Sequence, residues 1–99
     1  MDGNVVAMIV VAAYDIRDDG RRSRVAATLQ SWGDRIQKSV FVLDLSGDDL
    51  TALRDRLACT IDADTDSLYM FRQCATCWST VDCVGQAAKP DKVLYWAVL

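Results

Sequence analysis

The stretch VVAMIVVAAY, residues 5–14, is apolar at every position. A strand with one face in water alternates apolar and polar residues, and this run does not, so it predicts a strand covered on both faces. Its length is about half of what a membrane span needs. No Lys or Arg precedes the run, and Tyr14-Asp15 follows where a signal peptide has small residues. We therefore expect a cytoplasmic protein.

Capping residues and periodicity predict the next elements. Asp18 or Asp19 can cap a helix that runs to about Trp32, and Gly33 is suited to end it. A second strand is predicted over residues 35–45, because apolar side chains recur there on both faces.

The second half of the chain continues the pattern. Ser46 and Asp49 have the spacing of a capping box and open a second helix. Residues 67–73 alternate as a strand, and residues 80–84 predict a weaker fourth strand. The apolar residues that define the second helix are Leu50, Leu53, Leu57 and Ile61.

These elements predict an α+β, ferredoxin-like sandwich, in which a four-stranded antiparallel sheet carries two helices on one face. The order is read as β-α-β-α-β-β. The alternative, β-α-β-β-α-β, applies if residues 35–45 form a bent pair of strands.

Two helices can cover only one face of such a sheet, although the first strand is apolar on both. We therefore expect a two-fold homodimer with stacked sheets. Residues 1–86 are predicted to form the domain, and 87–99 a linker and a C-terminal strand. The apolar run Lys92–Leu99 would pair with a sheet edge of its own or of a partner subunit.

Composition restricts the chemistry. The 99 residues suit one domain, and their net charge is −3. There is no histidine, which excludes Ser-His-Asp and Cys-His catalysis. Glutamate is absent as well, so aspartate supplies every side-chain carboxylate.

Four cysteines are expected as free thiols, although their even number leaves disulfides open. Cys74 and Cys77 form a Cys-x-x-Cys pair with Cys83 nearby. A zinc site would need a fourth ligand from Cys59 or from the partner chain.

Six of the eleven basic residues lie between positions 17 and 38. Such a cluster can hold phosphate groups on an acidic protein, or it can be a solvated helix face. The six residues are Arg17, Arg21, Arg22, Arg24, Arg35 and Lys38.

A specific set of residues runs through positions 14–41. It comprises Tyr14-Asp15-Ile16, Asp18-Asp19, Arg21-Arg22-Ser23-Arg24-Val25, Leu29 and Gly33-Asp34-Arg35-Ile36-Gln37-Lys38-Ser39-Val40-Phe41. In this set the chain resembles the CRISPR-associated protein two family, in which Tyr-Asp ends the first strand and a Gln-x-Ser-Val-Phe run forms the second.

The resemblance implies a ferredoxin-like dimer whose C-terminal strand crosses to the partner. It implies a divalent metal, usually Mg²⁺, held by Asp15, and endonuclease activity on RNA or double-stranded DNA. It also implies a role in spacer acquisition, in which the dimer bridges CRISPR integrase subunits and holds a DNA duplex.

Asp15 is accordingly the predicted catalytic and metal-binding residue. Two such carboxylates at a two-fold axis would repel each other unless a cation lay between them, and Mg²⁺ takes one or two carboxylates and keeps several waters. Taken alone, Asp15 also suits a turn-initiating residue after a strand.

The resemblance implies that Arg22, Arg24 and Arg35 lie around the site, and Arg17 and Arg21 lie close to them in sequence. These five are the predicted nucleic-acid-binding residues, because the guanidinium fork matches phosphate, although they also suit a helix surface paired with Asp18 or Asp34. The resemblance also implies that Tyr14 and Phe41 lie near the metal, with Ser39 as a further candidate, although an aromatic in an apolar strand is usually core.

Three functions remain open from the sequence. The first is a metal-dependent phosphodiesterase, the second a non-catalytic DNA-binding scaffold of an integration complex, and the third a generic ferredoxin-like binding module. The third has no feature of its own, such as a Gly-rich ligand loop.

Overall fold

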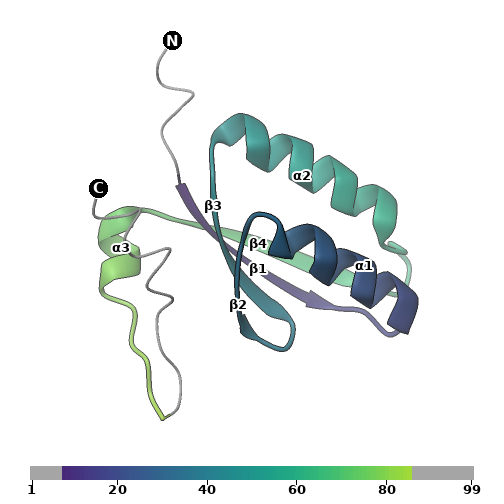
Figure 1. The fold of residues 1–99 in the computed structure, drawn as a ribbon, viewed down its shortest axis with the longest axis horizontal. Coiled ribbons are helices and arrows are strands. Elements are labelled where there is room, and N and C mark those ends of the chain that lie inside the picture. The colour runs from purple at the N-terminus through teal and green to yellow at the C-terminus, as the bar shows by residue number, and fades with distance from the viewer. Residues whose placement is uncertain (1–7, 86–99) are drawn as a thin grey trace.

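The computed structural model describes residues 8–85. Three helices and four strands follow one another along the chain (Figure 1). They are β1 (Met8–Asp15), α1 (Asp19–Gln30), β2 (Gly33–Gln37), β3 (Val40–Leu45), α2 (Gly47–Thr60), β4 (Ser67–Gln73) and α3 (Ala75–Ser79). None of the described helices is long and apolar enough to cross a membrane.

The four strands form one sheet in the order β2-β3-β1-β4, with every neighbouring pair antiparallel. The α+β fold class and the ferredoxin-like sandwich are thus confirmed. The predicted order β-α-β-α-β-β is wrong, because residues 35–45 are a hairpin that turns at Lys38 and Ser39. The alternative order, β-α-β-β-α-β, is the one observed.

Both long helices begin at the predicted caps. The Asp18 carboxylate accepts a hydrogen bond from the amide of Arg21, and the Ser46 hydroxyl accepts one from the amide of Asp49. Helix α1 ends at Gln30, two residues before the predicted end. Trp32 therefore lies outside the helix, does not join the buried face formed by Val25 and Leu29, and is 37% exposed.

Helices α1 and α2 cover one face of the sheet and close the main core there (Figure 1). Val10, Ala12 and Tyr14 of β1 point to this covered face. Phe41, Leu43 and Leu45 of β3 lie beside them, and α1 and α2 contribute Val25, Leu29, Leu50, Leu53 and Leu57.

Gly33 does not end α1 but opens β2, where the backbone of β3 comes very close. A Cβ atom on Gly33 would lie 2.0 Å from the carbonyl oxygen of Val42, so no larger residue fits without moving the strands apart. This close approach explains the glycine without any need for a helix stop.

The opposite face, called here the open face, is only partly covered. The short helix α3 lies over it, and Trp78 packs against Ile9 and Val42. The strand predicted over residues 80–84 is absent from the described structure, where these residues follow α3 as an exposed segment without regular structure. The prediction that β1 is apolar on both faces is correct for Met8 onward, while residues 5–7 and 86–99 lie outside the described residues.

Candidate nucleic-acid interface

Asp15 is the last residue of β1 and lies opposite Ser67 in β4. Strand alternation puts its side chain on the open face, together with Ala13 and Tyr69. The carboxylate is exposed, and no hydrogen bond or ion pair joins it to any described residue. Asp15 is therefore available to a ligand.

The loop that follows Asp15 is held by Arg22. Its guanidinium donates to the carbonyl of Ile16 at 2.8 Å and to that of Arg17 at 3.4 Å, and it pairs with Asp19. Ile16 itself is buried in the main core. Arg22 thus fixes the backbone between Asp15 and α1, which leaves fewer of its donors for a phosphate.

Arg21 is held more firmly still. Its Nε donates to the Asp66 carboxylate at 2.8 Å, and Nη2 donates at 3.3 Å. Asp66 also accepts from the amide of Asp62 and the hydroxyl of Thr65. The hydrogen bond from Arg21, followed by that from the Asp62 amide, lowers the pKa of Asp66 to about 2. This pair ties α1 to the turn before β4.

The remaining arginines are free to different degrees. Arg17 and Arg24 are exposed, and neither guanidinium has a partner among residues 8–85. Arg35 donates to the Tyr14 hydroxyl at 3.4 Å and lies 5.2 Å above the centroid of the Phe41 ring. Arg17 and Arg24 therefore have the most freedom to bind phosphate.

Tyr14 and Phe41 lie on the covered face, away from Asp15. Their rings stack with centroids 6.3 Å apart, and both side chains are buried. The Tyr14 hydroxyl donates to the carbonyl of Lys38, and the Ser39 carbonyl accepts from the Tyr14 amide. The burial of the two aromatics agrees with their core interpretation, and the Tyr14 hydrogen bonds also fix the hairpin turn.

The open face carries a pair of stacked aromatic residues that was not predicted from the sequence. Tyr69 and Phe71 of β4 are 59% and 50% exposed, and their rings stack at 5.9 Å with an angle of 3° between planes. Residues two apart on a strand share a face, which is the signal that could have found them. Together with Asp15 they give this face an apolar centre and an acidic end.

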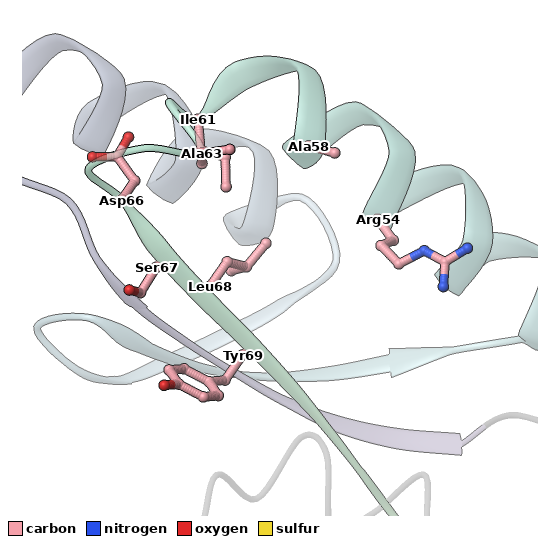
Figure 2. A pocket seen from close by; sticks show the side chains of 8 residues that line it. All are labelled: Arg54, Ala58, Ile61, Ala63, Asp66, Ser67, Leu68 and Tyr69. Atoms are coloured by element: carbon pink, nitrogen blue, oxygen red, sulfur yellow. The ribbon is translucent and has the colours of Figure 1, made fainter.

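A groove of about 440 Å³ lies between α2 and the outer edge of β4 (Figure 2). Arg54 and Ala58 line it from the helix, and Ser67, Leu68 and Tyr69 line it from the strand. The groove begins where β4 leaves Asp66, so it borders the end of the sheet at which Asp15 lies.

The described residues contain no group of three or more His, Cys, Asp or Glu side chains that could hold a metal ion. Asp15 offers one carboxylate, which fits only an ion that keeps most of its waters, as Mg²⁺ does. The zinc alternative for Cys74, Cys77 and Cys83 has no supporting geometry within residues 8–85.

A family model described as CRISPR associated protein Cas2 matches residues 8–81, which include β1, the arginine cluster and β4. The chain belongs to the Cas2 family. The resemblance carried by residues 14–41 is thereby confirmed.

Two relatives and one solved structure agree with this assignment. CRISPR-associated endoribonuclease Cas2 4 of Rhodospirillum rubrum is 45% identical over 67 residues, 68% of this chain and 54% of that relative. The chain thus spans about half the length of that protein. CRISPR-associated endoribonuclease Cas2 1 of Chloroflexus aurantiacus is 34% identical over 85 residues, 85% of this chain and 91% of that relative.

A crystal structure of a hypothetical protein from Thermus thermophilus has a TM-score of 0.76 and 33% identity, covering 85% of this chain and 98% of that one. The two Cas2 relatives are named as nucleases, so the family is one of CRISPR-associated nucleases. Within this Cas2 fold, Asp15 is an exposed carboxylate at the end of β1, and Arg21 and Arg22 are engaged by contacts within the chain.

Proposed function

We propose that this protein is a Mg²⁺-dependent endonuclease in which Asp15 holds the metal ion. The observation that carries the proposal is the exposed carboxylate at the end of β1, which has no partner among residues 8–85 and lies beside the loop that contains Arg17. Magnesium bound there would polarise a phosphodiester and lower the pKa of a bound water. The relatives named as endoribonucleases favour RNA as substrate, and a DNA duplex is the second candidate.

The functional unit of this proposal is a homodimer with open faces stacked. Tyr69 and Phe71 leave an apolar surface uncovered between Trp78 and Asp15, and a second copy would cover it. Because Asp15 lies on the same face, a two-fold axis near this end would bring two carboxylates toward each other. Their repulsion would favour a bound cation.

Different residues of this chain would position the loop, bind phosphate and hold the metal ion. Arg22 positions the backbone that follows Asp15, and the free guanidinium groups of Arg17 and Arg24 bind the phosphates of the substrate strand. Asp15 binds the ion through its carboxylate oxygens. Since there is no histidine, proton transfer falls to water rather than to a side-chain imidazole.

The second candidate is a DNA-binding scaffold that works with the CRISPR integrase in spacer acquisition without cutting. The free arginines favour it, because phosphate contacts hold a duplex without any need for Asp15. Both functions use the same end of the molecule, and they differ in the role of one carboxylate.

A paired assay separates the two functions. Cleavage of a labelled RNA and of a DNA duplex is measured with and without Mg²⁺ for wild type, Asp15→Asn and Asp48→Asn, and binding is measured in parallel. Asp48 is the matched control, because it lies in the first turn of α2, after the end of β3 that pairs with Met8. That position is at the opposite end of the sheet from Asp15.

We expect Asp15→Asn to lower cleavage by at least about a hundredfold while binding changes by less than about threefold. Asp48→Asn should match wild type in both. Cleavage that persists in Asp15→Asn at the wild-type rate would exclude Asp15 as the metal site. Binding without cleavage in all three proteins would favour the scaffold.

A further inference from the structure

The Cys-x-x-Cys pair lies at the first turn of α3, away from Asp15 and the arginines to which the proposed function assigns roles. Cys74 is the N-cap residue of this helix, and its Sγ accepts a hydrogen bond from the amide of Cys77 at 3.2 Å. Both residues are exposed, so reagents in solution can reach them.

The two thiols are electronically unequal. Hydrogen bonds from the Cys77 thiol and amide lower the pKa of Cys74, whereas the same thiol contact raises the pKa of Cys77. Thiolate, not thiol, attacks a disulfide, and a second thiol three residues away can displace the attacking group. Cys74 therefore has the features of an attacking thiol, and Cys77 those of a resolving thiol.

We propose that Cys74 and Cys77 form a redox-active dithiol, which closes to an intramolecular disulfide by exchange with a small-molecule disulfide. Residues three apart on a helical turn face the same side, and the observed contact between the Cys74 sulfur and the Cys77 amide already brings the pair together. The other two cysteines, Cys59 and Cys83, have no such contact with a described residue.

The exchange balances in two steps. The Cys74 thiolate attacks one sulfur of the small disulfide, which forms a mixed disulfide and releases one thiolate. Cys77 loses its proton to solvent, and its thiolate attacks the Cys74 sulfur and releases the second thiolate. Together with the proton that Cys74 gave up to form its thiolate, the protein loses two electrons and two protons, and the two released thiolates take up protons from solvent to become two thiols.

The location gives this reaction a structural consequence. Trp78 follows Cys77 directly and packs against Ile9 and Val42 on the open face, with an indole N–H that has no acceptor among the described residues. A disulfide between residues 74 and 77 would fix the turn that carries this side chain. The redox state of the pair would then affect how Trp78 covers the open face.

The experiment uses the whole protein, incubated with oxidised glutathione at neutral pH and quenched with an alkylating agent. Chymotryptic cleavage after Phe71 and Trp78 releases residues 72–78, which contain Cys74 and Cys77 and no other cysteine. We expect this peptide to become unalkylated and lighter by two hydrogen atoms, while Cys59 and Cys83 remain alkylated.

Three variants make the assignment specific. Cys59→Ser/Cys83→Ser should form the same disulfide at the same rate. Cys77→Ser should stop at a mixed disulfide on Cys74. Cys74→Ser should react with oxidised glutathione at least about threefold more slowly than wild type, because the attacking thiolate is gone. A peptide that stays reduced while Cys59 becomes glutathionylated would overturn the proposal, as would equal rates for Cys74→Ser and Cys77→Ser.

Discussion

The two faces of the sheet are built for different partners. On the covered face, Val10, Phe41 and Leu43 are fully buried by helices of the same chain. On the open face, Tyr69 and Phe71 are half exposed or more, and within residues 8–85 the cover comes from Trp78 of the short helix α3. The covered face therefore defines the fold of one chain, whereas the open face has apolar area left for another molecule.

The same contrast separates two carboxylates at one end of the sheet. Asp66 is buried and accepts from Arg21, Asp62 and Thr65, so it is fully used in holding α1 to β4. Asp15 lies one strand away, exposed and without a described partner. A carboxylate already satisfied by the fold stabilises it, and a carboxylate left unsatisfied is available to a metal ion.

The largest expected effect compares two phenylalanines. Phe41→Ala on the covered face should lower the free energy of unfolding by about 3–5 kcal/mol, because it leaves a cavity in the main core. Phe71→Ala on the open face should cost within about 1 kcal/mol in the monomer. Urea unfolding over a series of protein concentrations measures both and separates any contribution from association. Equal losses at the lowest concentration would mean that both faces belong to the core of one chain.

A second pair of variants tests whether the open face binds another copy. Phe71→Ser should weaken the homodimer at least about tenfold, because each subunit loses an aromatic side chain from the stacked face. Arg72→Ser is the control, since the next residue of β4 points to the other face and is also exposed. Sedimentation equilibrium gives both dissociation constants. A similar loss in the two variants, or no dimer in wild type, would contradict the stacked arrangement.

Much of the fold could be predicted because its local signals are strong. The apolar run of β1, the Asp18 and Ser46 caps and the leucines of α2 all identified their elements correctly. The β2-β3 hairpin was only the alternative prediction, because Ser39 is the one common turn residue in its turn, Lys38-Ser39, and Gly, Pro, Asn and Asp are absent from that turn. The short helix α3 was missed because cysteine is an unusual N-cap.

The candidate site was predictable in composition but not in arrangement. Sequence proximity grouped five arginines, whereas their partners separate them, because Asp66 is 45 positions from Arg21 along the chain. Ser39 and Phe41 were both predicted near the site, whereas the structure puts Ser39 in the hairpin turn and Phe41 in the main core. Local sequence patterns predict that arginines cluster at this site, whereas long-range contacts such as that between Arg21 and Asp66 decide which of them can bind a ligand.

The ion pair between Arg21 and Asp66 should make the stability of the protein depend on pH in acid. The folded-state pKa of Asp66, about 2, lies below the ordinary value of 3.8, so the stabilisation is present above about pH 4 and is lost as the pH falls toward 2. Wild type should therefore lose stability over this range. Asp66→Asn should be less stable at neutral pH and show a shallower loss in acid, measured by urea midpoints at several pH values. An unchanged acid slope in Asp66→Asn would mean that other carboxylates account for it.

The smallest effect distinguishes free arginines from engaged ones. A guanidinium that contacts a phosphate displaces a counterion, so each lost contact should reduce the slope of log affinity against log salt by about one unit. Arg17→Ala and Arg24→Ala should each flatten the slope in this way for a DNA duplex or an RNA, whatever its sequence.

Arg21→Ala is the matched comparison, because it removes the same charge from the same end of α1. Its guanidinium is held by Asp66, so we expect the salt slope to stay at the wild-type value and the stability to fall instead. Fluorescence anisotropy over a salt series, beside urea unfolding of the same samples, gives both quantities. If Arg21→Ala flattens the slope as much as Arg24→Ala does, the ion pair opens on binding, and Arg21 contacts phosphate as its place in the cluster first indicated.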